Sequence, residues 1–436
     1  WTARMLKLLL VILTLLVFSR LCLRFSRCPW MTSAFLWLLV ASAVFRSDLQ
    51  YARNYQLPLL LVLCCIQLID RERATRSYRF RNLFFAGVCL GLAIGVKLTF
   101  VLPGLALAAA LIFSVRPFRT AVRDLIALTS GAVFSLIPAV LILLRAGWER
   151  LMFNLVDYHH LNILWRQSEG YDAGMDAAGK TKLGVGQLLE VSNLGILLLT
   201  VVMIASLLIG KRERPANGRG RFISLSFLIA ATILLYLIPT PAWIWYLSPL
   251  WVTLFLTAAE GYGRLQGEGI RRWIHFTVML LVGATILVNS SREYQNIEMA
   301  IDPEMWTPRR IKSESFALKS ELDREGVSGR IATLLPLYAL EAGLPVYLEL
   351  VSADFGYRVG DYLERTKRKT FRISSVSEIS QLLQNDPPAA IVCGLETELD
   401  KPIAQFAVEN GYRLNRRLIR GARVYIRTHD DKKEER

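Results

Sequence analysis

The sequence is poor in the residue patterns that disulfide frameworks and metal sites require. Of its six cysteines, Cys393 alone lies in the polar C-terminal region, and the others lie in or beside apolar runs: Cys22, Cys28, Cys64, Cys65 and Cys89. No CxxC spacing occurs, so neither a disulfide framework nor a zinc site is predicted. The C-terminal region also has no GxGxxG and no GxxxxGK[ST], and nucleotide binding there is not supported.

Charge is also scarce over long stretches. Hydrophobic residues make up 53% of the 436 residues, charged residues make up 20%, and the apolar residues come in blocks. Such blocks are typical of helices that cross a hydrocarbon core roughly 30 Å thick. Residues 83–115 would be about 50 Å long as one helix, so we expect a turn marked by Lys97 and Pro103. We predict about ten spans, at residues 5–23, 31–45, 57–69, 83–96, 98–115, 125–144, 194–209, 222–238, 244–259 and 274–289.

The basic residues are concentrated in alternate loops. The loops after the first, third, fifth, seventh and ninth predicted spans hold 18 of them, against 3 (Arg46, Arg53 and Lys97) in the other short loops. The positive-inside rule places the basic set in the cytoplasm, and the remaining loops and the C-terminal region outside. This bias explains most of the net charge of +16, so nucleic acid is not expected as a partner. Because the chain opens at Trp1 on the outer side, we expect a further span and outer loop upstream.

From about residue 290 the composition becomes that of a soluble α/β domain. Strands alternating with helices predict a small open sheet. The predicted organisation is a transmembrane domain over residues 1–289, an extracytoplasmic α/β domain over 290–429 and a charged tail over 430–436. Within the second domain we predict helices at 313–324, 375–384 and 402–410, strands at 330–336, 346–350 and 389–393, and a hairpin at 412–426 that turns at Arg420-Gly421.

A polar island at residues 45–58 separates two of the apolar runs. It contains Asp48, Arg46 and Arg53 together with Tyr51 and Tyr55. One interpretation is an ordinary interfacial loop anchored by arginine and tyrosine. The other is one wall of an active site that faces the extracytoplasmic space.

Further polar groups gather at the other predicted outer ends. Lys97 closes a helix with small residues at 86, 87, 91, 93 and 95, which allow close helix packing. Lys97 either snorkels to the interface or holds the phosphate of a lipid carrier. His159 and its neighbour His160 are either polar surface or a ligand or base. Tyr246, with Trp243 and Trp245, forms either an aromatic belt or a platform on which a sugar stacks.

The middles of most predicted spans contain no ionisable residue. Intramembrane charge and paired broken helices are the usual marks of a transporter, and neither pattern is evident here. The distribution suits an enzyme that works at the outer membrane–water boundary better than a conduit.

Several motifs resemble those of the GT-C membrane glycosyltransferases. They are Ala3-Arg4-Met5 at the start of a span, Arg46-Ser47-Asp48, Gly95-Val96-Lys97 and residues 239–249 (PTPAWIWYLSP), in this order and on the predicted side. The branch with protein O-mannosyltransferases and the lipid A aminoarabinose transferase is the most similar. Residues 338–347 and 354–358 also resemble bacterial members of that family.

The resemblance implies a GT-C-like bundle in the bacterial inner (plasma) membrane. The implied reaction is inverting transfer of a hexosyl or pentosyl group from a polyprenyl-phosphate sugar donor to an envelope acceptor, which is a lipid, glycan or protein. Asp48 would match the family's secondary acid, whereas the principal acid is expected upstream of Trp1. Lys97, Arg46 and Arg53 would match contacts to the carrier phosphate.

The sequence leaves the cofactor and one alternative function open. No cofactor is indicated with certainty, and a divalent metal beside Asp48 is compatible with the sequence. The alternative function is a non-catalytic membrane protein, which would be a transporter or a scaffold for lipid-linked sugars.

Overall fold

A computed structural model gives the fold of most of the chain. The described residues are mostly helical, with a small sheet near the C-terminus. They form two compact units, the first made of Trp1–Ala146 and Asp172–Glu293 and the second of Gly147–Tyr171 and Tyr294–Arg436. The described residues are 2–42, 44–45, 55–72, 79–113, 117–171, 175–190, 193, 200, 216–265, 268–302, 306–394, 396 and 398–428.

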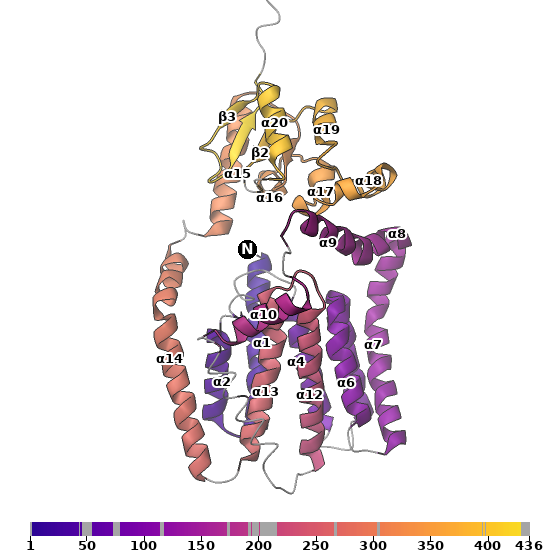
Figure 1. The fold of residues 1–436 in the computed structure, drawn as a ribbon, viewed down its shortest axis with the longest axis vertical. Coiled ribbons are helices and arrows are strands. Elements are labelled where there is room, and N and C mark those ends of the chain that lie inside the picture. Colours follow the sequence, from indigo (N-terminus) through magenta and orange to yellow (C-terminus); the bar gives the residue numbers. More distant parts are fainter. Residues whose placement is uncertain are drawn as a thin grey trace, which may run out of the picture. The chain divides into compact units, whose positions relative to one another are not determined.

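The first unit is a bundle of helices (Figure 1). The short turns η2 (Leu98–Phe100) and η4 (Ile244–Leu247) precede α6 and α13, and α14 (Glu268–Ile301) begins in this unit and ends in the second. The other helices are α1 (Thr2–Ser26), α2 (Pro29–Ala41), α4 (Gln56–Glu72), α5 (Arg79–Val96), α6 (Val101–Phe113), α7 (Phe118–Ala146), α10 (Ala177–Leu188), α12 (Ala216–Leu237) and α13 (Ser248–Arg264).

Five helices in the described part of the chain are long and apolar enough to cross a membrane, which indicates a membrane protein. Ten spans were predicted; of residues 194–209 only residue 200 is described, and each other predicted span overlaps a helix. Shorter apolar helices cover Pro29–Ala41, Gln56–Asp70 and Leu98–Phe113. The five long segments are Met5–Ser26, Arg79–Val96, Phe118–Ala146, Gly220–Leu237 and Glu268–Val288.

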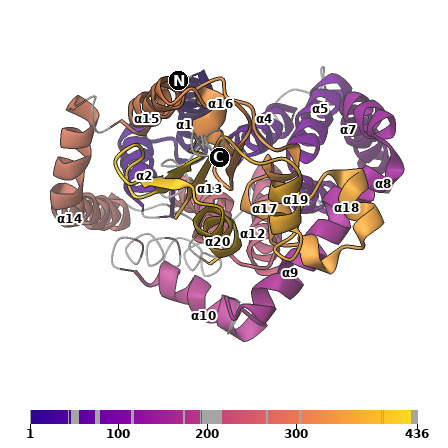
Figure 2. The ribbon, with the colours of Figure 1, turned by 90° about the horizontal axis from the view of Figure 1, so that it is seen from above.

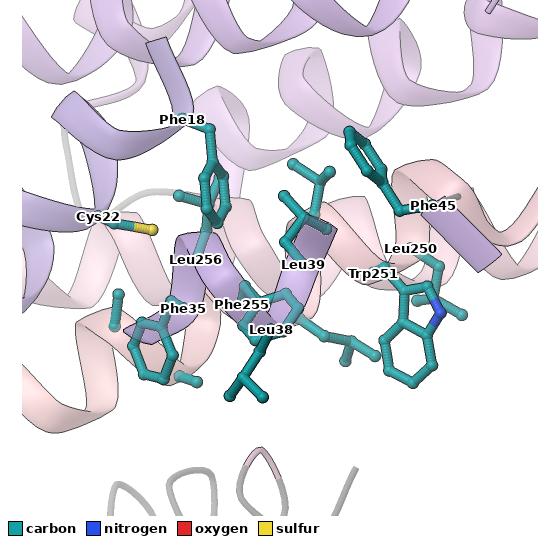
Figure 3. Packing of buried hydrophobic residues seen from close by; sticks show 14 of the residues in the cluster. Phe18, Cys22, Phe35, Leu38, Leu39, Phe45, Leu250, Trp251, Phe255 and Leu256 are labelled. Carbon is teal, nitrogen blue, oxygen red and sulfur yellow. The ribbon is translucent and has the colours of Figure 1, made fainter. Parts of the chain in front are cut away.

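Helix α13 supplies the centre of one hydrophobic core. All of its residues from Ser248 to Tyr262 are buried. Trp251 and Phe255 lie in a cluster with Phe18 of α1 and Phe35 of α2 (Figure 3). The Phe255 ring centroid is 6.3 Å from that of Phe18 and 5.7 Å from that of Phe35. In lipid, van der Waals packing of this kind holds helices together, because the solvent is itself apolar.

Helices α5 and α7 lie side by side and approach each other closely (Figure 2). A Cβ atom on Gly87 of α5 would lie 1.9 Å from the carbonyl oxygen of Leu128, and one on Gly131 of α7 would lie 2.0 Å from that of Phe84. Only glycine fits such a contact between two helix backbones. The predicted close packing of the small-residue helix is therefore confirmed, and its partner is α7.

Ion pairs join four helices at one end of this bundle. Arg24 Nε of α1 lies 2.6 Å from Asp70 Oδ2 of α4, and Arg221 of α12 pairs with the same carboxylate. Arg221 also contacts Glu260 of α13 (Nη1–Oε2 3.5 Å), and Arg264 lies 2.6 Å from the other oxygen of Glu260. These residues flank the loops that carry the arginine excess. Tertiary contacts thus neutralise part of that excess.

The second unit contains a four-stranded sheet with strand order β1-β2-β4-β3. Strands β1 (Ile331–Thr333) and β2 (Ala390–Cys393) are parallel, whereas β4 (Arg423–Ile426) is antiparallel to β2 and to β3 (Arg413–Asn415). Helices pack on both faces, because Ile391 shares a core with residues of α19 and α20, and Ala390 shares one with residues of α15 and α16. These helices are α15 (Thr307–Arg324), α16 (Pro336–Glu341), α19 (Ile379–Asn385) and α20 (Lys401–Glu409).

One predicted strand of this sheet is wrong. Residues 346–350 make only an isolated bridge between Val346 and Ile331, and the chain then forms η6 (Leu348–Leu350). The hairpin is confirmed, with Gly421 at φ 80° in its turn. Further helical segments of this unit are α8 (Trp148–Met152), the π-helical η3 (Phe153–Asp157), α9 (Tyr158–Ser168), α17 (Asp354–Tyr357), η7 (Gly360–Tyr362) and α18 (Arg365–Phe371).

Candidate functional site

Lys97 marks a break between two helices of the bundle. Its backbone is extended, with φ −151° and ψ 110°, between the end of α5 and the start of η2. The Lys97 N–H still donates to the Ala93 carbonyl oxygen at 3.0 Å, and its own carbonyl accepts from Phe100 N–H at 3.0 Å. Pro103 lies in the first turn of α6, where a missing N–H costs nothing. The break predicted at Lys97 and Pro103 thus falls at Lys97.

The Lys97 ammonium lies over two tyrosine rings. Its Nζ is 3.8 Å from the ring centroid of Tyr55 and 5.4 Å from that of Tyr246. The two ring centroids are 5.4 Å apart, and Tyr55 is buried. A cation on aromatic faces is held by the ring quadrupole, with a gain of about 0.5–2 kcal/mol. Three segments distant in sequence therefore fix the position of one positive charge.

This cluster and the arginine pairs lie at opposite ends of the same helices. Tyr55 immediately precedes α4, whereas Asp70 lies near its last residue. Lys97 immediately follows α5, whereas Arg79 is its first residue and pairs with Asp124 of α7. The predicted separation of polar groups between the two ends is thus seen on each of these helices.

The segment with Tyr246 is held by a lysine that the sequence did not single out. Lys180 of α10 is buried, and its Nζ donates to the Leu237 carbonyl oxygen at 3.0 Å and to Thr240 Oγ1 at 2.7 Å. Its carbonyl oxygen accepts a hydrogen bond from the Tyr236 hydroxyl at 3.0 Å. A cation at the C-terminus of α12 satisfies carbonyls that lack helical partners. Lys180 therefore fixes the chain that leads to Tyr246.

Lys180 also lies in a GxxxxGK[ST] pattern over residues 174–181. Such a loop cradles phosphates where it follows a strand and opens a helix. Among the described residues the first strand begins only at Ile331. The side chain of Asp176 caps α10 by accepting a hydrogen bond from Gly179 N–H at 2.7 Å. The Lys180 ammonium donates to the Leu237 carbonyl oxygen at the end of α12 and is thus not directed at a phosphate. In this setting the pattern serves helix capping.

The remaining predicted residues fall elsewhere. Asp48, Arg46 and Arg53 lie outside the described residues, in the segment just before Tyr55. His159 belongs to α9 of the second unit, where its side chain is exposed and its ring centroid is 5.5 Å from that of Tyr158. Lys97 and Tyr246 are thus the predicted pair that the bundle brings together.

Metal ligands do not cluster in the described part of the chain. Its His, Cys, Asp and Glu side chains form no group of three or more that would hold an ion. The loop with Asp48 lies outside the described residues.

The second unit contains its own cluster of charged groups. Arg358 donates to Asp354 Oδ2 at 2.9 Å and to the Tyr158 hydroxyl at 3.1 Å. Burial raises the pKa of Tyr158, and the Arg358 guanidinium opposes that rise. Burial likewise raises the pKa of Glu396, followed by the carboxylates of Asp354 and Asp400, while Arg358 again opposes it. Asp354 is thus a carboxylate paired with Arg358, at the first position of α17, where Ala353 is the N-cap.

Comparison with protein-family models and with curated proteins finds no match to this chain.

Proposed function

We propose that the chain is a membrane glycosyltransferase of the GT-C kind. It transfers a sugar from a polyprenyl-phosphate-linked donor to an envelope acceptor at the outer face of the bacterial inner membrane. The observation that carries the proposal is the position of the Lys97 ammonium over Tyr55 and Tyr246. This is a fixed cation among aromatic rings, at the helix ends opposite the arginine pairs.

Each group in the cluster has a chemical role in such a reaction. The bond between the sugar carbon and the carrier phosphate breaks as the acceptor oxygen bonds to that carbon, and the phosphate leaves with an added negative charge. Lys97 offsets this charge, as cations do for developing anions in general. The ring of Tyr246, with the stacked pair Trp243 and Trp245 (centroids 4.7 Å apart), offers flat faces to the sugar. Asp48, as the secondary acid, assists removal of the acceptor's proton.

The proposal includes an orientation of the chain. About ten spans form the bundle, the arginine-rich loops lie in the cytoplasm, and the α/β unit lies outside. The donor arrives by lateral diffusion of its lipid tail, which is why no nucleotide-binding fold is needed. Arg46 and Arg53 join Lys97 at the carrier phosphate, and His159 takes part in binding the acceptor or the donor.

The positions of buried charges favour an enzyme over a transporter. In the described helices, buried Asp70, Asp124, Glu260 and Lys180 all lie within about two turns of a helix end. A conduit for a charged substrate places such groups near the middle of the membrane.

A transfer assay tests the proposal. Membranes that contain the chain are incubated with radiolabelled polyprenyl-phosphate sugars, and label in the envelope acceptor fraction is counted. We expect Lys97→Met to lower transfer about 100-fold, which is typical for the loss of one stabilising charge or donor. Lys182→Met, on the exposed face of α10, is the matched control and should leave the rate unchanged.

A second variant addresses the carboxylate. Asp48→Asn should lower transfer at least about 100-fold, in the range for general acid–base groups, with unchanged protein level and thermal stability. Full transfer by both variants would refute the proposal. Movement of labelled lipid across vesicle membranes without transfer would instead support the transporter or scaffold alternative.

A further inference from the structure

The second unit has an open cavity of about 660 Å³. The first wall comes from α8, η3 and α9, and the second from the chain between Leu348 and Gly356 and from the end of α18. This volume lies within the range of about 300–1,000 Å³ that is usual for small-molecule sites. All of the lining residues belong to the second unit.

The cavity has an aromatic floor and an apolar rim. Phe153 and Phe371 stack with ring centroids 4.2 Å apart, and Phe153 is buried. On the rim, Phe355 is 55% exposed and Leu348 is 51% exposed. Large apolar side chains that are half exposed beside a cavity are typical of a binding surface. The ligand that fits this rim has an apolar portion.

The charges in the cavity are of one sign. Its charged lining residues are Arg150 and Arg372, and no carboxylate lines it. In the part of the chain that the structure describes, neither guanidinium is in an ion pair. Arg372 adopts a left-handed conformation at the end of α18, with φ 53° and ψ 55°. Two arginines without acidic partners fit a phosphate group, which accepts their parallel N–H donors.

One wall of the cavity is close in sequence to a candidate membrane span. Helix α7, one of the helices able to cross a membrane, ends at Ala146, and Arg150 follows four residues later. Trp148, between them, is 69% exposed. Tryptophan and arginine next to a span are typical of the headgroup region.

We propose that this cavity binds an anionic phospholipid. Arg150 and Arg372 hold its phosphate. The second N–H of the Asn154 amide donates to an ester oxygen, and the Thr370 hydroxyl oxygen, whose own proton goes to the Thr366 carbonyl, accepts from a headgroup hydroxyl. The first methylenes of the lipid chains lie on Phe355 and Leu348. A free phosphate or an acidic glycan would use the arginines and leave the apolar rim uncovered. This inference is independent of the transferase proposal, because it concerns a different set of residues and requires no turnover.

Native mass spectrometry of the full chain in detergent provides the test. The probes are dioleoyl phosphatidylglycerol, dioleoyl phosphatidylcholine and glycerol 3-phosphate. We expect one phosphatidylglycerol molecule to bind at least about tenfold more tightly than phosphatidylcholine, because the choline cation of phosphatidylcholine is repelled by the two arginines and cancels the lipid's net charge. The double variant Arg150→Gln/Arg372→Asn should lose this preference, whereas Arg416→Gln, an exposed arginine of the same unit, should keep it.

Two features keep the test decisive. Asparagine tolerates the left-handed conformation at residue 372, so loss of charge is separated from loss of fold. Leu348→Ala shortens a rim side chain that is 51% exposed and should weaken phosphatidylglycerol without affecting glycerol 3-phosphate. Equal binding of both lipids, an unaltered preference in the double variant, or glycerol 3-phosphate binding as tight as the lipid would overturn the proposal.

Discussion

Replacing Gly87 by alanine inserts a methyl group at the closest approach of α5 and α7. The new Cβ would lie 1.9 Å from the Leu128 carbonyl oxygen and 3.0 Å from the Ala132 nitrogen. Carbon and carbonyl oxygen normally approach to about 3.3 Å, so the two helices must separate locally by about 1.4 Å. The obstructing atoms belong to a helix backbone and have no rotamer by which to move away.

The expected cost combines two opposing terms. Overpacking of this kind costs about 1–3 kcal/mol, while exchange of glycine for alanine within a helix returns about 0.5–1 kcal/mol. Separation of the helices also weakens the similar close packing at Gly131. The net change in the free energy of unfolding is therefore expected to be destabilising. We therefore expect Gly87→Ala to lower the free energy of unfolding by about 1–2 kcal/mol.

Denaturation of the purified chain by SDS in mixed micelles measures this effect, with α-helical circular dichroism as the signal. Gly95→Ala is the matched control on the same helix, because its Cβ would meet only the Leu136 Cδ2 at 3.6 Å and the Ala139 Cβ at 3.9 Å. These are ordinary contacts, so the control should be neutral or slightly stabilising. If Gly87→Ala proves as stable as Gly95→Ala, the close backbone contact between α5 and α7 is refuted.

Three further predictions concern buried or paired charges. Asp70→Asn should lower the free energy of unfolding by about 3 kcal/mol in the same SDS assay, because Arg24 and Arg221 lose their shared carboxylate; Asp70→Glu should recover part of the loss. Lys180→Met should cost about 2 kcal/mol through two lost charge-assisted hydrogen bonds, and hydrogen exchange should quicken at the end of α12. The raised pKa of Glu396 means that the folded chain binds this proton more tightly than the unfolded chain, so its stabilising contribution is present at low pH and disappears as pH rises through the folded pKa. The melting temperature of the second unit should therefore fall less between about pH 4 and pH 7 in Glu396→Gln than in the wild type, and parallel curves would contradict this.

The elements predicted best are those that sequence period and local stop signals define. The β2 strand is recognisable from a continuous apolar run, and α20 ends at Glu409 shortly before Gly411, whose φ is 71°. The strand predicted at 346–350 is wrong because pairing with β1 does not continue beyond Val346 and the chain then forms η6. The segment between the predicted spans at 125–144 and 194–209, for which no helix was predicted, contains α8, α9 and α10, which are short and thus give weak helical signals.

The candidate site was predictable residue by residue but not as a cluster. Lys97 and Tyr246 stand out because each is polar or aromatic at the edge of an apolar run. Their contact through Tyr55 depends on how α4, α5 and η4 meet, which no local pattern encodes. Lys180 was missed for the same reason. Its side chain binds the C-terminal end of α12, a helix that starts 36 residues later in the chain, at Ala216. Its one sequence signal, the GxxxxGK[ST] pattern, points to a different chemistry.

The two ends of the bundle are fastened by different forces. Carboxylates and guanidiniums cross-link α1, α4, α12 and α13 at one end with directional bonds, which resist sliding. At the other end tilted ring contacts surround Lys97, and Lys180 holds the C-terminus of α12 by two hydrogen bonds. Because ion pairs cross-link the helices at the first end, we expect the helices to separate more readily at the aromatic end. A bulky amphiphile can then enter the bundle at that end without unfolding it.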